Sequence, residues 1–165
     1  MVLSACVCTG CVMAQGVKKR IEELIYLKKI MLMFQGEVRY KNAMLSEGFL
    51  AVSLRAKEPY NSLFERLSEA TENNNSSTMA DVFDNEVEDI LTGNTYLNGE
   101  DIKKLKELGE TMGYQDQKMQ LANIDLYIER LSSSIDEDKG KMNETMKVYR
   151  TLGIMAGIMI TIVLI

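Results

Sequence analysis

Apolar residues recur at intervals of three and four positions along the last third of the chain. The repeat is formed by Leu121, Ile124, Ile128, Leu131, Ile135, Met142 and Tyr149, with the polar residues Asp138 and Thr145 at its remaining positions. This seven-residue spacing places the side chains on one helix face. Gly140 weakens the helix locally, but no proline interrupts it. The pattern predicts one long helix that begins near Tyr114 and continues into the uncharged segment 151–165.

Helical spacing also predicts a second long helix, over residues 18–40. Its inward-facing residues are expected to be Ile21, Leu24, Ile25, Leu27, Ile30, Met31, Phe34 and Val38. Three shorter helices are expected from about Ala43 to Ala56, from Pro59 to about Ala70 and from Asp81 to Leu91. A fourth is expected to start near Asn98, and Gly109 and Gly113 are expected to end it. The polar segment 71–78 is expected to be a loop. The fold class is therefore expected to be all-α.

Charge is confined to the middle of the chain. All 19 Lys and Arg residues and all 24 Asp and Glu residues lie between Lys18 and Arg150, so both ends are uncharged and apolar. We expect an N-terminal membrane anchor over 1–16, an antiparallel helical bundle over 17–147 and a C-terminal transmembrane helix over 148–165. The first anchor is short, because spanning a bilayer takes about 17–20 apolar residues.

Basic residues lie beside both expected anchors. Lys18, Lys19 and Arg20 follow the first one, and Lys141, Lys147 and Arg150 precede the apolar run of the second. Basic flanks mark the cytoplasmic side of a span, so the bundle is expected in the cytoplasm and both tips outside. A cleaved signal peptide is the alternative for the first segment, although its basic residues would precede the apolar run.

Small residues recur at intervals of four in the last anchor. Gly153, Gly157 and Thr161 share one helix face, and such faces allow close packing of membrane helices. The cysteines at 6, 8 and 11 have a spacing that suits a metal, but in an uncharged apolar run cysteine behaves as a small hydrophobic residue. We expect packing there and no metal site.

The composition argues against several classes of function. A formal net charge of −5 disfavours nucleic-acid binding, and the absence of histidine removes the commonest general base and metal ligand. No phosphate-binding glycine loop is present. The acidic cluster over 81–89 lacks the alternating ligands and central glycine of an EF-hand, so a solvated acidic face is expected. The chain is not expected to be an enzyme or to bind a cofactor.

Several blocks of sequence resemble one family. These are Leu105–Gly113, followed by Asp116 and Gln120, the closing segment Leu152–Gly157, and, in the first half, Glu37–Tyr40 and Pro59–Phe64. Together they resemble the stage III sporulation protein AB family over nearly the whole chain. The most specific part is the Leu-Gly-Glu-Thr-Met-Gly block at its fixed distance from the C-terminal anchor.

The resemblance implies a mother-cell membrane protein of the secretion-like channel that links mother cell and forespore during sporulation. The family's cytoplasmic helices are similar to inner-membrane platform proteins of type II secretion and type IV pilus systems. A cytoplasmic secretion-type ATPase, other membrane subunits and the lipid bilayer are the implied partners. The alternative is a small two-span, holin-like protein that forms pores or lesions, which would need little mass between its spans.

The positions that match the family motifs are the candidate partner contacts. They are Glu37, Tyr40, Gly109, Glu110, Gly113 and Asp116. The alternative is a structural role, in which Gly109 and Gly113 shape a turn and Asp116 caps the last helix.

Overall fold

A computed structural model describes residues 2–41, 44–72, 78–112 and 116–164, with side chains described for 16–40, 44–72, 78–112, 116–142 and Glu144. Within these residues the structure contains six helices and no strand, so the all-α prediction is confirmed. The helices are α1 (Val2–Lys41), α2 (Leu45–Ser53), α3 (Tyr60–Glu72), α4 (Met79–Leu91), α5 (Gly99–Met112) and α6 (Gln117–Leu164).

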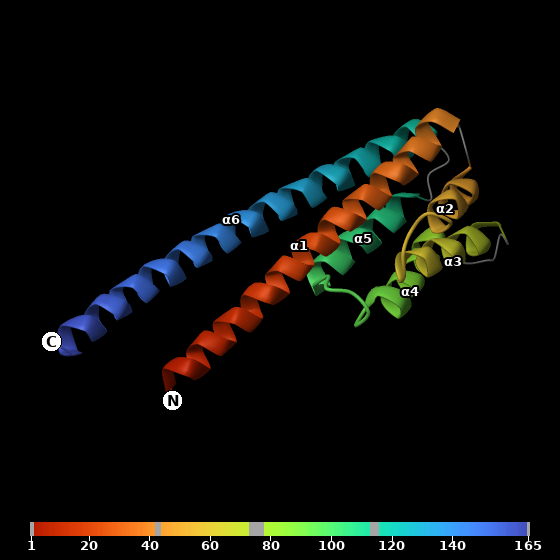
Figure 1. Ribbon diagram of the computed structural model, residues 1–165. Helices are drawn as coiled ribbons and strands as arrows, with labels where there is room; N and C mark the ends of the chain where they lie inside the picture. The colour runs from red at the N-terminus through yellow and green to blue at the C-terminus, as the bar shows by residue number, and fades with distance from the viewer. Residues whose placement is uncertain (1, 42–43, 73–77, 113–115, 165) are drawn as a thin grey trace.

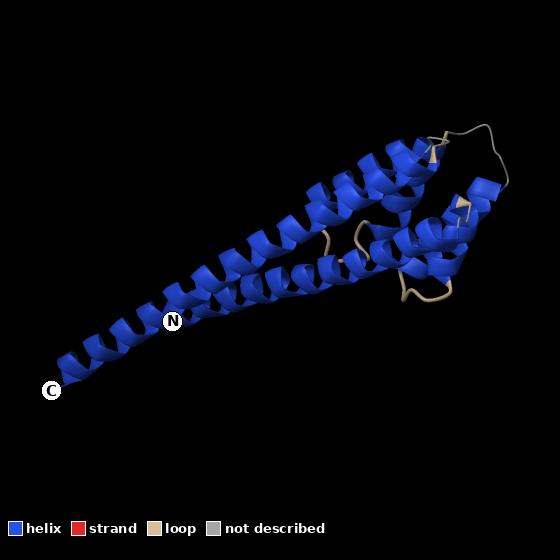
Figure 2. Cartoon of the chain, turned by 90° about the horizontal axis from the view of Figure 1, so that it is seen from above, coloured by secondary structure: helices blue, strands red, loops and turns tan. Residues whose placement is uncertain are grey.

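The two long helices form the axis of the molecule. Helix α1 has 40 residues and α6 has 48, which correspond to about 60 Å and about 72 Å at ~1.5 Å per residue. They lie side by side and antiparallel, so the first residues of α1 and the last of α6 are at the same end (Figures 1 and 2). Helices α2, α3 and α4 pack near the opposite end, and α5 lies between them and α6 (Figure 1).

The apolar face predicted for α1 is buried, with one exception. Seven of its eight predicted positions belong to the core: Ile21, Leu24, Leu27, Ile30, Met31, Phe34 and Val38. The prediction was wrong for Ile25, whose side chain is 44% exposed. Leu24 already occupies the inward position of that turn, and residue 25 is one step, about 100°, further around the helix.

The C-terminal repeat is confirmed as one helix that runs without interruption through Ser132–Ser134 and Gly140. Ile124, Leu131 and Ile135 are buried, while Leu121, Ile128 and Met142 pack against the core at its edge. Asp138, polar within the repeat, is also buried. Tyr127 is a core residue that the seven-residue pattern does not include.

The four phenylalanines of the chain meet in one cluster, and each comes from a different helix. Phe34 of α1 stacks on Phe49 of α2 with ring centroids 4.7 Å apart. Phe64 of α3 lies 5.9 Å from Phe49, and Phe83 of α4 lies 6.4 Å from it. Aromatic pairs at these distances add specific contacts to the burial of apolar area. This cluster links the three short helices to one another and, through Phe34, to α1.

Side-chain caps set three helix starts. Thr78 and Asp81 form a reciprocal capping box at α4, so this helix begins at Met79, two residues before the predicted start. Asn98 and Asp101 exchange the same pair of hydrogen bonds before α5. Asp116 Oδ1 accepts from the Lys118 N–H at the start of α6, which confirms its predicted capping role.

The remaining helix limits differ slightly from the predictions. Helix α2 is shorter than the predicted 43–56 at both described ends. Helix α3 begins just after Pro59, whose carbonyl accepts from Leu63 N–H, and extends to Glu72 into the predicted loop. These shifts amount to one to three residues, and helix ends are commonly uncertain by this order because caps and packing set them.

Gly109 was expected to end the fifth helix, and this prediction was wrong. Helix α5 continues through it to Met112. A Cβ at position 109 would lie 2.4 Å from both Cβ and Cγ of Phe83. The glycine therefore permits close packing of α5 on α4 within a regular helix, and it does not form a turn.

In the part of the chain that the structure describes, no helix has a stretch long and apolar enough to cross a membrane. The backbones of the expected anchors belong to α1 and α6, but nearly all of their side chains fall outside the described ones. The side chains of 1–15 and 145–165 are not described, and they include the ridge of Gly153, Gly157 and Thr161 within the span of α6.

Candidate partner-binding site

A charged triad joins α1, α5 and α6 inside the molecule. Arg20 of α1 donates from Nε to Asp101 Oδ2 at 2.7 Å and from Nη2 to Asp101 Oδ1 at 2.8 Å. Its Nη1 donates to Asp138 Oδ2 of α6. The Asp101 side chain is only 2% exposed. Two parallel hydrogen bonds fix the orientation of the Arg20 guanidinium against the Asp101 carboxylate in addition to pairing their charges. The triad therefore holds the three helices in one register.

The triad explains the polar residue in the α6 repeat. A carboxylate at a buried position is costly unless it is paired, and Arg20 supplies the partner. The hydrogen bond to Asp101 raises the pKa of Arg20 above its ordinary value, so its positive charge is permanent. From sequence, Arg20 was assigned only to a basic membrane flank. The signal that could have revealed the triad is Asp138 at a core position.

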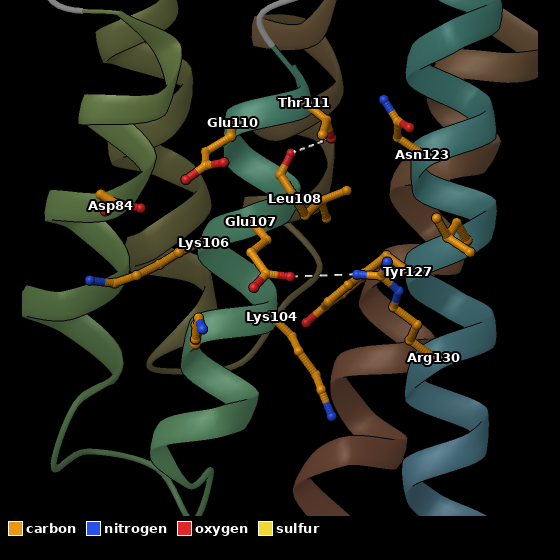
Figure 3. Close-up of a pocket in the computed structure, with 12 residues that line it drawn as sticks. Asp84, Lys104, Lys106, Glu107, Leu108, Glu110, Thr111, Asn123, Tyr127 and Arg130 are labelled. Carbon is orange, nitrogen blue, oxygen red and sulfur yellow. Dashed lines mark hydrogen bonds and ion pairs between the residues drawn. The ribbon is translucent and has the colours of Figure 1, made fainter.

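An open groove lies between α5 and α6, with α4 at one edge (Figure 3). It encloses about 630 Å³. Leu108 and Tyr127 line it together with Leu126, which is 46% exposed. A second hollow of about 620 Å³ shares Lys103, Lys104, Glu107, Leu126 and Arg130 with it and extends down α6 to Glu137. The two hollows form one continuous surface depression, here called the α5–α6 groove.

Several of the charged residues that line the groove form ion pairs. Lys106 Nζ lies 2.9 Å from Glu88 Oε2, and this hydrogen-bonded pair lowers the pKa of Glu88. Lys104 lies 2.7 Å from Glu100, and Arg130 lies 3.5 Å from Glu107 across the groove. In Figure 3, Lys106 points to α4 while Glu107 and Arg130 face each other.

Two polar atoms of the groove are buried without a hydrogen-bond partner in the described part of the chain. One is the hydroxyl of Tyr127, whose side chain reaches from α6 toward α5 (Figure 3). The other is Oδ1 of Asp84, on α4. Tyr127 is 3% exposed, and burial raises the pKa of its hydroxyl. Each of these two atoms has less than 1 Å² of exposed surface, so both lie beneath the floor of the groove and not on its surface.

The structure brings three of the predicted site residues to one end of the α1–α6 pair. Glu37 is buried and accepts from Arg55 of the α2–α3 connection at 3.0 Å, whereas Tyr40 is 84% exposed. Gln117 donates to the Val38 carbonyl at 2.7 Å, which ties the end of α1 to the start of α6 beside Asp116.

Two other predicted positions lie on α5. Glu110 lines the α5–α6 groove, and Gly109 packs against Phe83 behind it. Gly113 lies outside the described residues. The motif positions thus lie in two places: the end of the α1–α6 pair that is remote from the chain termini, and the groove. The basic residues of the groove were not predicted as site residues.

The acidic residues of α4 are used in structural contacts. Asp81 caps the helix, and Arg66 of α3 lies 3.2 Å from Glu86 and 3.1 Å from Asp89. Among the described side chains, no group of three or more His, Cys, Asp or Glu residues is arranged to hold a metal ion. The side chains of Cys6, Cys8 and Cys11 lie outside that set.

The fold and the groove define a class of small all-helical proteins in which a two-helix axis carries a compact bundle. The sequence profile of the family described as "Stage III sporulation protein AB (spore_III_AB)" matches residues 1–165, and the chain belongs to this family. The resemblance noted from the sequence is therefore confirmed, and the protein is a sporulation protein by family.

A curated relative and a solved structure agree with this assignment. Stage III sporulation protein AB of Bacillus subtilis (strain 168) is 23% identical over 158 residues, which are 94% of this chain and 90% of the relative. The solved structure of Stage III sporulation protein AB (SpoIIIAB) matches with a TM-score of 0.65 at 18% identity, over 76% of this chain and 97% of that chain. At that identity the structural match supports the helical fold.

Proposed function

We propose that this protein is a non-enzymatic platform subunit of the channel that links mother cell and forespore during sporulation, anchored in the mother-cell membrane at both ends. The observation that carries the proposal is the antiparallel arrangement of α1 and α6. Both chain ends lie together, and α2, α3 and α4 lie toward the other end (Figures 1 and 2). Two anchors at one end of a two-helix axis would hold the bundle at a fixed distance from the membrane.

The charge distribution supports this orientation. Lys18 and Lys141 are exposed on the stretches of α1 and α6 that lead toward the chain ends, with side chains 69% and 66% exposed. Basic residues at this place favour the cytoplasmic, anionic face of a membrane. The bundle would then face the cytoplasm, where the channel's secretion-type ATPase is the partner in this proposal.

The anchors are proposed to contact other membrane subunits through the ridge of Gly153, Gly157 and Thr161. In lipid, apolar burial gives little drive for association between helices, so close backbone approach along small residues supplies the packing contacts. The bundle and the anchors would thus contact different partners, and the protein would couple these partners mechanically.

Complementation in a spore-forming host that lacks its own family member tests the proposal. The full chain should restore heat-resistant spores and should co-purify with the channel's ATPase from detergent-solubilised membranes. The matched variant Gly157→Leu should lose the other membrane subunits while the ATPase stays bound. Full rescue by the bundle alone, residues 17–147, would contradict the anchored platform. Leakage of the membrane on expression, without rescue, would favour the pore-forming alternative.

A further inference from the structure

We propose that the helix pair meets the lipid hydrocarbon at Arg150 of α6 and near residue 7 of α1. Residues 8–17 of α1, here called the neutral stretch, then lie outside the hydrocarbon beside residues 141–150 of α6, although they carry no charge. The inference rests on the proposed function and deepens it, because it states which part of each helix contacts the lipid. Its observations are the register of α1 and α6 and the order of charges along them.

The Arg20 triad fixes the register of the two helices. Arg20 of α1 donates to Asp138 of α6, so these two residues lie at one level along the axis. The uncharged end of α6 begins at residue 151, thirteen residues beyond Asp138. Both helices are continuous and antiparallel, so thirteen residues from Arg20 in the same direction is residue 7 of α1 (Figure 2).

Contacts further along the helix pair agree with this register. Gln35 donates to Asp125, and Gln117 donates to the Val38 carbonyl at 2.7 Å; these pairs depart from the register of the triad by two and three residues. Arg39, with a longer side chain, reaches Asp125 at 2.9 Å with a departure of six residues. The neutral stretch continues ten residues beyond residue 7, so the uncharged ends of the two helices are offset by about 15 Å, which exceeds each of these departures.

The charges of α6 decide which helix sets the boundary. Four charged residues lie on α6 at the level of the neutral stretch: Lys141, Glu144, Lys147 and Arg150. If the neutral stretch were immersed, these residues would be drawn toward the hydrocarbon, where one charged residue costs about five times what one valine gains. The neutral stretch has only two valines and one methionine as larger apolar residues, so leaving it outside the hydrocarbon costs less.

This boundary holds the bundle away from the lipid. Tyr96, in the connection between α4 and α5, accepts a hydrogen bond from Lys19 of α1 at 2.9 Å. Lys19 is twelve residues from residue 7, a distance of about 18 Å along α1, whereas the headgroup layer is about 5–8 Å thick. Lipid contact therefore belongs to the ends of the two helices, and a stalk of one uncharged and one charged helix separates the bundle from the bilayer.

Cysteine reactivity tests the position of the boundary, because maleimides react with thiolates, which form in water and not in hydrocarbon. The full chain would be reconstituted without other proteins into vesicles of phosphatidylethanolamine and phosphatidylglycerol. Variants with a single cysteine would be treated with membrane-permeant N-ethylmaleimide before and after addition of detergent.

Four single-cysteine variants are compared. One retains Cys11, with Cys6 and Cys8 replaced by alanine. The other three carry Leu3→Cys, Glu144→Cys or Met159→Cys in a chain whose native cysteines are all alanine. Glu144 is exposed and provides the control in water at the level of the neutral stretch, and Met159 provides the control within the hydrocarbon.

The rates should divide the variants into two pairs. Cys11 and Glu144→Cys should react in vesicles within about threefold of their rates in detergent, whereas detergent should accelerate Leu3→Cys and Met159→Cys at least about tenfold. The proposal is overturned if detergent accelerates Cys11 as strongly as Met159→Cys, or if Leu3→Cys reacts in vesicles as fast as Glu144→Cys. In either case a protected Met159→Cys leaves the anchored platform intact. Fast reaction of Met159→Cys in vesicles would refute membrane anchoring itself, and the boundary with it.

Discussion

Gly109 is the residue at which α5 comes closest to α4. A Cβ there would overlap Phe83 at 2.4 Å, and the overlapping atoms include the Phe83 Cβ, which cannot move without its backbone. We expect Gly109→Ala to lower the free energy of unfolding by about 1–3 kcal/mol, because overpacking outweighs the gain in helix propensity of about 1 kcal/mol. Urea unfolding of residues 17–147, which contain every core residue that the structure describes, measures the change.

Gly140 provides the matched control for this substitution. It lies within α6, it is exposed, and a Cβ at this position would meet nothing within 4 Å. Gly140→Ala should therefore stabilise the same fragment by up to about 1 kcal/mol. Equal effects of the two substitutions would show that Gly109 has no packing role.

Two buried tyrosines predict how stability depends on alkaline pH. Burial raises the pKa of Tyr60 and of Tyr127, and the carboxylate of Glu23 adds to the effect at Tyr60. Each folded pKa is above that of the unfolded chain, about 10. Their contribution to stability is therefore fully present below about pH 10 and is lost as the pH rises above it.

An alkaline titration of the fragment 17–147 measures this effect. The ionisation of two tyrosines, followed by tyrosinate absorbance, should coincide with loss of the helical circular dichroism signal. Tyr127→Phe should remove one of them and move the unfolding midpoint to higher pH. Ionisation of both residues with the helices intact would contradict the burial argument.

The elements themselves could largely be predicted from the sequence, because the apolar period of α1 and α6 is a local property. What could not be predicted are contacts between residues far apart in the chain. Asp138 disturbs the α6 repeat, and only the packed structure shows that Arg20 occupies the space beside it. Gly109 likewise has the local signature of a helix end, and only the close approach of Phe83 explains why a glycine occupies this position inside a continuous helix. The groove was missed because its charged residues resemble any solvated helix face.

The Arg20 triad is expected to set the register of α1, α5 and α6. Arg20→Met would leave Asp101 and Asp138 buried without their cation, and loss of one partner from a buried ion pair costs about 3–5 kcal/mol. Arg39→Met is the matched control on the same helix. Its pair with Asp125, at 2.9 Å, is exposed on both sides and is worth less than about 1 kcal/mol. Urea unfolding of the two variants should show this difference, and similar losses would mean that the triad is no more than a surface ion pair.

At the scale of the whole molecule, the direction of the two long helices predicts membrane topology. Both lead to the same end, so both anchors should enter the membrane from one side, with the bundle on that side (Figure 1). Because the basic residues Lys18 and Lys141 lie near that end, we expect this side to be the cytoplasmic one.

Cysteine labelling of intact cells tests that topology. In a variant with Cys6, Cys8 and Cys11 replaced by alanine, a single cysteine at Asp89 should react with a membrane-impermeant maleimide only after the cells are opened, since its side chain is 70% exposed on the bundle. A cysteine appended after Ile165 should react in intact cells. Reaction at position 89 in intact cells would place the bundle outside and reverse the orientation. If neither site reacts until the cells are opened, the C-terminal helix does not cross the membrane, and a two-anchor platform is wrong for this chain.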